Sequence, residues 1–324
     1  MKMKTIGNHK WMILGAVLLA LVLAVPMVGS AVAAPVNTKV NIPPEVVNVD
    51  SSGAEVYFRK GTTDYGPFEN GDLASLEPGT YSWKLRINNY TSPLRTGFIV
   101  DGTNELTVTA ADYCKMKVLV DSKMKNLDNS SGYITFYGVS GQFDNNDELY
   151  FPMGANLSWY VNVNGKTSGA HYKTVDCTPL DSGEYPVVYG SYCKMQIIVP
   201  AELQTLGATV RIYGISQTFT GGETVVLPMG QTITWYLKIN GKEVPHTGKP
   251  VDCTPINVTA ADYCTVVNNT GQTINIYKGI TLAPGASVVL PMGANIEWKY
   301  NAGPSTPNRW PGIKKTVDCT PIGP

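Results

Sequence analysis

The chain has 324 residues, with 25 basic and 25 acidic side chains and only three histidines. Without the three lysines of an N-terminal leader, 22 basic residues stand against 25 acidic ones, a net charge of about −3. Because no basic stripe is present, nucleic acid and anionic membrane surfaces are poor partner candidates. His171 and His246 are the only near-neutral bases after the leader, and no catalytic motif accompanies them, so we do not expect an enzyme.

Residues 1–33 have the features of a secretory signal peptide. Lysines precede an apolar run from Trp11 to Val28, and residues 31–33 supply the small side chains that signal peptidase requires. We therefore expect cleavage after Ala33 and an extracellular or cell-surface location. The alternative is an uncleaved anchor, because an apolar run of about 18 residues is just long enough to span a bilayer; a membrane is a partner only in that case.

The rest of the chain reads as four consecutive copies of one unit. A Tyr-Cys pair opens each of the last three copies and the motif Val-Asp-Cys-Thr-Pro closes it, which accounts for all six cysteines. The first copy lacks both cysteines and has Val-Asp-Gly-Thr in place of the closing motif. The expected repeats are residues 34–108, 109–187, 188–258 and 259–324.

The joint absence of both cysteines from the first copy indicates bonds within a repeat, since a bond between repeats would leave an orphan thiol. The predicted pairs are Cys114 with Cys177, Cys193 with Cys253, and Cys264 with Cys319. The alternatives are a metal site or free core thiols, but the chain has no Cys-x-x-Cys spacing and too few histidines for zinc. We therefore expect no metal and no cofactor. Disulfides of this kind persist in oxidising surroundings, which agrees with secretion.

A period of two dominates every repeat, and no stretch after the leader has a helical pattern. In the third repeat Ile233, Trp235 and Leu237 share one face of a strand that ends at Asn240-Gly241, a strong signal for a type I′ hairpin. Asn164-Gly165 repeats this signal. The expected fold is all-β, with four tandem small Ig-like antiparallel β-sandwich repeats, three of them with one internal disulfide. The tryptophans assigned to their cores are Trp83, Trp159, Trp235 and Trp298.

The first repeat resembles the PEGA-type surface repeats, in which a Gly-Ala strand and a turn precede a Pro-Gly-x-Tyr strand. Residues 53–58 (GAEVYF) and 76–85 (LEPGTYSWKL) carry this resemblance, and all four units are similar to bacterial or archaeal Ig-like domains. The disulfides depart from the PEGA pattern. The resemblance implies an extracytoplasmic, non-catalytic module used for spacing, adhesion or contact with a cell wall.

Tyrosines recur at strand positions opposite in phase to the core tryptophans. A ring on an outer face can stack on a sugar or pack against another protein. The alternative is that these tyrosines only pair with side chains on neighbouring strands, because tyrosine has a high β-propensity. The binding candidates are Tyr137, Tyr160, Tyr213, Tyr236 and Tyr277. The tyrosines that precede the opening cysteines, Tyr113, Tyr192 and Tyr263, are also expected to point away from the core.

Two further features have competing interpretations. One aspartate position is common to all four repeats: Asp101, Asp176, Asp252 and Asp318. These residues either form a polar or Ca²⁺ contact or act as Asx-type caps of the closing turn. We favour the cap, because a lone carboxylate is a poor calcium site. Trp310 lies in an insertion from 301 to 315, either as a contact site or as a cap over the last sandwich.

The leading hypothesis is a secreted or cell-surface structural and adhesive protein that self-associates or contacts other surface proteins. The rival hypothesis is a carbohydrate-binding protein whose outward tyrosines engage a polysaccharide multivalently, so that weak sites are multiplied by the array.

Overall fold

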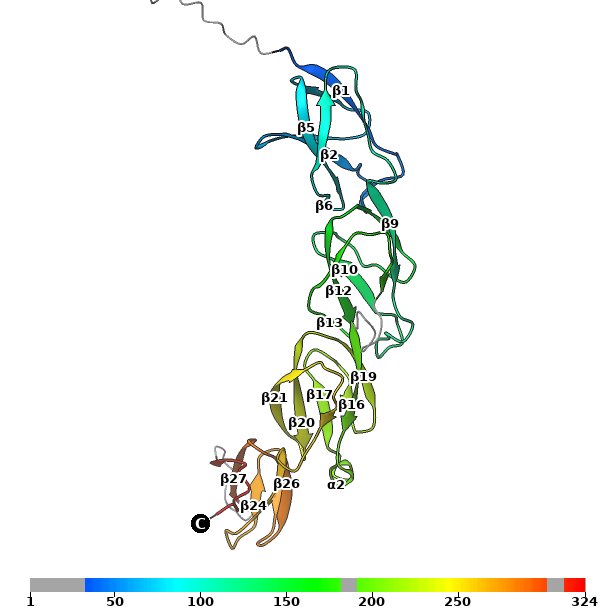
Figure 1. Cartoon of the computed structure of the whole chain (residues 1–324). Coiled ribbons are helices and arrows are strands. Elements are labelled where there is room, and N and C mark those ends of the chain that lie inside the picture. The colour runs from blue at the N-terminus through cyan, green and yellow to red at the C-terminus, as the bar shows by residue number, and fades with distance from the viewer. Residues whose placement is uncertain (1–32, 182–190, 302–311, 324) are drawn as a thin grey trace, which may run out of the picture.

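The chain forms an elongated molecule whose regular secondary structure is almost entirely β-strand (Figure 1). The computed structural model describes residues 33–181, 191–301 and 312–323. Within these ranges the only helix is α2 (Ala201–Gln204), and no helix is long and apolar enough to cross a membrane. The all-β prediction is confirmed. The leader, its cleavage site after Ala33 and Trp310 involve residues outside the described ranges.

The strands form where apolar residues alternate with polar ones. Strand β20 (Thr232–Ile239) buries Ile233, Trp235 and Leu237 and leaves the residues between them more exposed. Strand β5 (Gly79–Ile87) shows the same alternation around Trp83. A single row of apolar side chains per strand is sufficient here, because each sheet has one face towards a core and the other towards water.

The first segment of the molecule comprises strands β1–β8 in two sheets. One sheet has the order β4-β1-β8, and the other has the order β3-β2-β5-β6 with β7 also paired to β5. The remaining bounds are β1 (Val36–Asn41), β2 (Glu55–Lys60), β3 (Thr63–Phe68), β4 (Leu73–Leu76), β6 (Tyr90–Thr91), β7 (Arg95–Val100) and β8 (Leu106–Thr107).

The second segment comprises strands β9–β15. One sheet has the order β11-β9-β15, and in the other β12 pairs with β10, β13 and β14. The bounds are β9 (Tyr113–Leu119), β10 (Tyr133–Phe136), β11 (Glu148–Pro152), β12 (Asn156–Val163), β13 (Lys166–Thr167), β14 (His171–Thr174) and β15 (Leu180–Asp181).

The third segment repeats this arrangement with the sheets β19-β16-β22 and β18-β17-β20-β21. Its other bounds are β16 (Tyr192–Ile198), β17 (Thr209–Ile212), β18 (Thr218–Phe219), β19 (Thr224–Pro228), β21 (Lys242–Pro250) and β22 (Ile256–Asn257).

The fourth segment has the sheets β23-β26 and β25-β24-β27-β28. The bounds are β23 (Tyr263–Val267), β24 (Ile274–Ile276), β25 (Ile280–Leu282), β26 (Ser287–Pro291), β27 (Asn295–Tyr300) and β28 (Ile313–Thr316). Its smaller sheet has two strands where the other three segments have three.

The sheets are not purely antiparallel, which corrects one detail of the prediction. Strand β8 pairs with β1, β15 with β9, and β22 with β16 in parallel. These short strands follow the closing turn. At this turn the chain crosses to the sheet that holds the opening strand, and the short strand then runs parallel to the opening strand. The parallel strand thus ties the end of each of these segments to its beginning.

Four clusters of buried apolar side chains follow one another along the chain, one for each segment. The tryptophans assigned to cores all lie in these clusters and are almost fully buried: Trp83, Trp159, Trp235 and Trp298. Tyr90 of the first segment and Tyr192 at the start of β16 belong to the cluster of the second segment. Neighbouring segments therefore share part of their apolar packing.

Two of the three predicted disulfides are present. Cys114 is bonded to Cys177 and Cys193 to Cys253. The predicted bond between Cys264 and Cys319 is wrong, because both cysteines are free, the first buried and the second exposed.

The fourth segment holds its closing turn less tightly than the second and third segments do. In place of a parallel strand it has one isolated bridge, between Asn268 and Ile322. The thiol of Cys264 is hydrogen-bonded to Cys319, and burial, followed by this bond, raises the pKa of Cys264 to about 11. The two thiols are neighbours without being joined.

The closing cysteines lie in bends outside the strands. Cys177, Cys253 and Cys319 have φ angles of 64°, 65° and 65°, in the left-handed region. In the first segment Gly102 takes this position with a φ of 86°. A preceding aspartate holds each turn by accepting the backbone N–H two residues on, which makes these residues Asx caps: Asp101, Asp176, Asp252 and Asp318.

Candidate functional site

The junctions between segments hold most of the tyrosines that the sequence analysis selected. Tyr137, Tyr213 and Tyr277 follow the strand residue that faces the core tryptophan, and their side chains are 70%, 62% and 47% exposed. Their backbone N–H groups donate to the main chain of the tryptophan strand, which fixes the start of the turn that follows. The rings therefore project at the end of each segment that faces its predecessor.

A hairpin asparagine of each segment bonds to the next segment. The side-chain amides of Asn88, Asn164 and Asn240 donate to the carbonyl oxygens of Tyr150, Val226 and Val289, at 2.9, 2.8 and 3.0 Å. These three asparagines have φ angles of 52°, 52° and 48°, and residues 165 and 241 also have positive φ, as a type I′ turn requires. The predicted Asn-Gly hairpins are confirmed, and they place an amide against an edge strand of the following sandwich.

The opening tyrosines were expected to face outward, and this prediction is wrong for Tyr192, which is fully buried. Tyr113, Tyr192 and Tyr263 lie at the start of a segment and pack against the cluster of the preceding one. Because the links between segments are short, a side chain at this position contacts the preceding sandwich and is shielded from water. Their hydroxyls reach carboxylates of the preceding segment: Glu45 at 3.5 Å, Asp121 at 2.7 Å and Glu202 at 2.9 Å.

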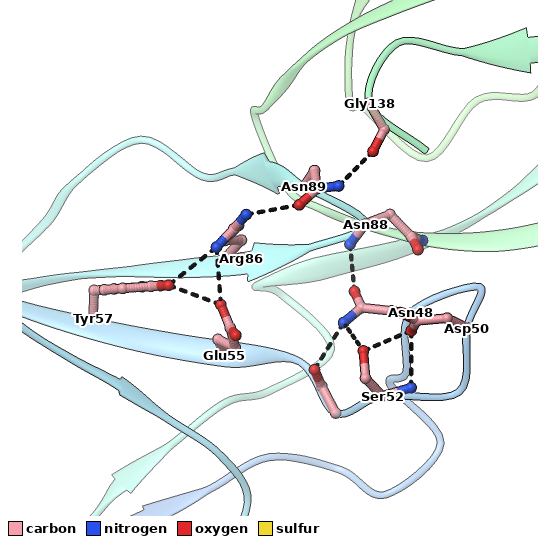
Figure 2. A network of polar contacts seen from close by, with 10 residues as sticks. Asn48, Asp50, Ser52, Glu55, Tyr57, Arg86, Asn88, Asn89 and Gly138 are labelled. Carbon is pink, nitrogen blue, oxygen red and sulfur yellow. Dashed lines mark hydrogen bonds and ion pairs between the residues drawn. The ribbon is translucent and has the colours of Figure 1, made fainter. Parts of the chain in front are cut away.

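Figure 2 shows the polar network at the first junction. Arg86 of β5 lies between Glu55 and Tyr57, and its other nitrogen donates to Asn89 at 2.7 Å. The Asn89 amide donates in turn to the carbonyl oxygen of Gly138 in the second segment. This chain of hydrogen bonds connects the outer face of the first segment to the next one.

The loops at residues 48–52 and 126–130 support these hairpins. Asn48 and Asn126 accept the backbone N–H groups of Asn88 and Asn164 at 2.5 Å. An aspartate and a serine close each loop through Asx-type bonds. These loops were not predicted from the sequence, although Asn-x-Asp-x-Ser recurs in two segments.

The links at residues 108–112 and 258–262 are folded turns. Asp112 accepts the Thr109 N–H at 2.6 Å, and Asp262 accepts the Thr259 N–H at 2.7 Å. The same carboxylates face a nitrogen-bearing side chain of the preceding segment: Arg95 is ion-paired with Asp112, and Nδ1 of the His246 imidazole lies 3.5 Å from Asp262. The identical Val-Thr-Ala-Ala-Asp links thus make equivalent contacts.

Each of these two side chains covers a core tryptophan. The Arg95 guanidinium lies 5.2 Å from the Trp83 ring, and the His246 ring stacks on Trp235 with centroids 4.0 Å apart. His171 stacks on Trp159 in the second segment, at 4.5 Å. Burial lowers the pKa of both histidines, and for His246 the charge of Asp262 opposes that shift. Stacked on tryptophan, the two imidazoles have a structural role.

Tyr160 and Tyr236 are half-buried on the outer face of the tryptophan strand. The Arg211 guanidinium lies 4.1 Å from the Tyr236 ring, so a cation already covers this ring. Lys166 and Lys242 lie 5.5 and 5.8 Å from the rings of Tyr213 and Tyr277 across the junctions. The candidate tyrosines therefore fall into two sets, those on sandwich faces and those at junctions, and the structure does not gather them into one site.

Hollows occur at each junction. The first has a volume of about 170 Å³ between residues 48–55 and Gly138, and the second, of about 450 Å³, lies at the equivalent place between residues 126–133 and Gly214. A third, of about 510 Å³, is lined by Lys242, Tyr277 and strands β27 and β28. In the described ranges no group of three or more His, Cys, Asp or Glu side chains is placed to hold a metal ion.

No family model, curated protein or solved structure matches this chain.

Proposed function

We propose that this chain is a secreted or cell-surface structural and adhesive protein without catalytic activity, built from four small Ig-like sandwich repeats. The repeats correspond to residues 34–108, 109–187, 188–258 and 259–324, and the second and third each contain one disulfide. The observation that carries the proposal is the repetition of the same contacts at successive junctions.

These contacts limit motion between repeats. Each junction has an amide-to-carbonyl bond from the hairpin and a hydroxyl-to-carboxylate contact from the opening tyrosine. A hydrogen bond stabilises by roughly 1 kcal/mol net, so two of them together with shared apolar packing oppose bending at each junction. A stiff, extended array is suited to holding a terminal surface away from a cell.

The disulfides support an oxidising, extracellular environment, since thiols in the cytosol are kept reduced. The proposed leader at residues 1–33 provides the route to that location. Few charges and exposed tyrosines at the junctions suit association with other surface proteins or with a second copy.

Sedimentation velocity with residues 34–324 over a wide concentration range tests the adhesive role. Self-association that increases with concentration supports it, and replacement of the junction tyrosines should weaken it: Tyr137→Ala, Tyr213→Ala and Tyr277→Ala. A protein that stays monomeric and binds no surface protein of its source contradicts it.

A second candidate function is multivalent carbohydrate binding through the same tyrosines. The large exposed fraction of the Tyr137 and Tyr213 rings favours it, because such rings offer a face to a sugar. Retention on an insoluble neutral polysaccharide, lost in the triple tyrosine variant, would support this function over self-association. Absence of retention on a panel of such polysaccharides would reject it.

A further inference from the structure

The last part of the chain differs from the rest in charge. Residues 263–324 contain five basic side chains and two acidic ones, a net charge of +3, whereas residues 34–262 contain 17 basic and 23 acidic ones, a net charge of −6. Such an asymmetry indicates a local surface that attracts anions on a molecule that otherwise repels them.

Five lysines line the two hollows beside Tyr277 of the fourth segment, and Lys242, Lys278 and Lys314 are three of them. Lys242 reaches it from β21 of the third segment and donates to the Tyr277 carbonyl oxygen at 2.6 Å. Lys278 follows Tyr277 in the chain, and Lys314 lies on β28. Tyr277 lines two hollows, one of about 510 Å³ with Lys242 and Lys314 and one of about 280 Å³ with Lys278. The exposed ring thus has lysines on both sides.

The positive charge at this place is poorly compensated within the chain. Among the described residues, Lys242, Lys278 and Lys314 have no carboxylate within ion-pair distance. Glu297 is the one acidic residue that lines the larger hollow, and its carboxylate accepts the N–H of Gly312. Lys242 is only 8% exposed; burial and then the charge of Lys278 lower its pKa, and Glu297 opposes the shift. An anionic ligand would relieve this repulsion.

The backbone at Lys278 supports a role for its side chain. Its φ angle is 76°, a conformation disfavoured for residues with a Cβ atom. The equivalent residues of the second and third segments are glycines, Gly138 and Gly214, with φ angles of 73° and 77°. A lysine at a turn position that favours glycine points to a use for its charge.

We propose that Lys242, Tyr277, Lys278 and Lys314 form a binding site for an acidic polysaccharide, a polymer of uronic acids. The apolar face of one sugar ring packs on Tyr277, and carboxylates of that sugar and its neighbours pair with the lysines on either side. Five lysines line the two hollows, and the ring of Tyr277 between them favours a sugar over a lipid headgroup as the group that the site binds. This inference rests on the proposed extracellular location and names a ligand class for the adhesive role.

Isothermal titration of residues 34–324 with polygalacturonate tests the site, with dextran as an uncharged polymer and phosphatidylglycerol vesicles as an anionic surface. We expect binding to polygalacturonate that weakens as salt is raised from 20 to 150 mM, because exposed charges are screened. The double variant K278E/K314E should bind at least tenfold more weakly. Tyr277→Ala should bind about fivefold more weakly at both salt concentrations, because stacking is not screened.

The preceding junction offers matched controls. Lys166 lies over Tyr213 as Lys242 lies over Tyr277, but the residue after Tyr213 is a glycine. Lys166→Glu and Tyr213→Ala should therefore change the affinity less than twofold. Lys278 and Lys314 are exposed, so melting followed by circular dichroism should show all variants folded.

Equal affinity for dextran, unchanged binding by K278E/K314E, or an equal loss in the Lys166 variant would overturn the proposal. Binding to vesicles without binding to polygalacturonate would replace it with a membrane contact. The failure of this proposal is separable from that of the adhesive role, because self-association is measured without polysaccharide.

Discussion

Replacement of Trp235 by alanine tests the assignment of the two faces of β20. The ring is 7% exposed, lies in the core of the third segment and stacks on His246 with an interplanar angle of 8°. Burying about 200 Å² of side chain at about 25 cal/mol per Å² stabilises by roughly 5 kcal/mol as an upper value. Large-to-small changes of aromatic core residues cost about 3–5 kcal/mol. A segment of about 65 residues has a total stability of roughly 3–10 kcal/mol, so the variant should lose about a third of it or more.

Hydrogen exchange followed by mass spectrometry resolves this effect by segment in the whole chain. Peptides from β17 to β21 should lose protection in Trp235→Ala, while those from the first segment keep theirs. Tyr236→Ala is the matched control, because this neighbouring ring is half-buried under Arg211, and its removal should cost below about 1 kcal/mol. Greater loss of protection in Tyr236→Ala than in Trp235→Ala would refute the assignment.

Three further predictions concern thiols, junctions and pH. Cys264 and Cys319 should be the two cysteines that alkylate in non-reduced protein. The alkylation rate at Cys264 should rise about tenfold per pH unit between pH 8 and 10, because its pKa is raised to about 11 and the thiolate is the reactive form. Recovery of the two cysteines as a crosslinked pair in peptide mapping would contradict this. Asn164→Asp should weaken the second junction by about 1–3 kcal/mol, because a carboxylate would face the Val226 carbonyl oxygen, and hydrogen exchange in β19 should increase. Burial lowers the pKa of His246 below its unfolded value. The contribution of the neutral imidazole to stability is therefore present above about pH 6.5 and is lost as the pH falls through the folded pKa. The melting temperature should decrease from pH 7.5 to pH 5, and this decrease should be smaller in His246→Asn.

Local features of the fold were predictable because they depend on short-range physics. The alternation around Trp235 identifies the buried face of β20, and Asn240-Gly241 specifies the turn that follows it. The left-handed closing turns were not predicted, although Gly102 in place of a cysteine was a signal that this position tolerates positive φ. The cysteine pattern identified two bonds and failed at the third, where a parallel strand is missing.

The contacts at the junctions could largely not be predicted from the sequence. Asn164 is already explained by its turn, so the pattern gives no sign of a second role in bonding to Val226. Tyr192 alternates with the core residues and reads as an outward side chain, because periodicity within one strand does not reveal a neighbouring sandwich. The lysines around Tyr277 come from two segments, and only the fold brings them together.

The central claim is that bonded junctions make the chain a stiff, extended array, and small-angle X-ray scattering of residues 34–324 tests it most directly. A compact globule of this length would have a radius of gyration of about 19 Å and an unfolded chain about 60 Å. Four sandwiches end to end, each roughly 30 Å long as the nine residues of β5 suggest, predict about 35 Å and the pair-distance distribution of a rod. A radius near the compact value, or scattering typical of freely jointed domains, would contradict the account.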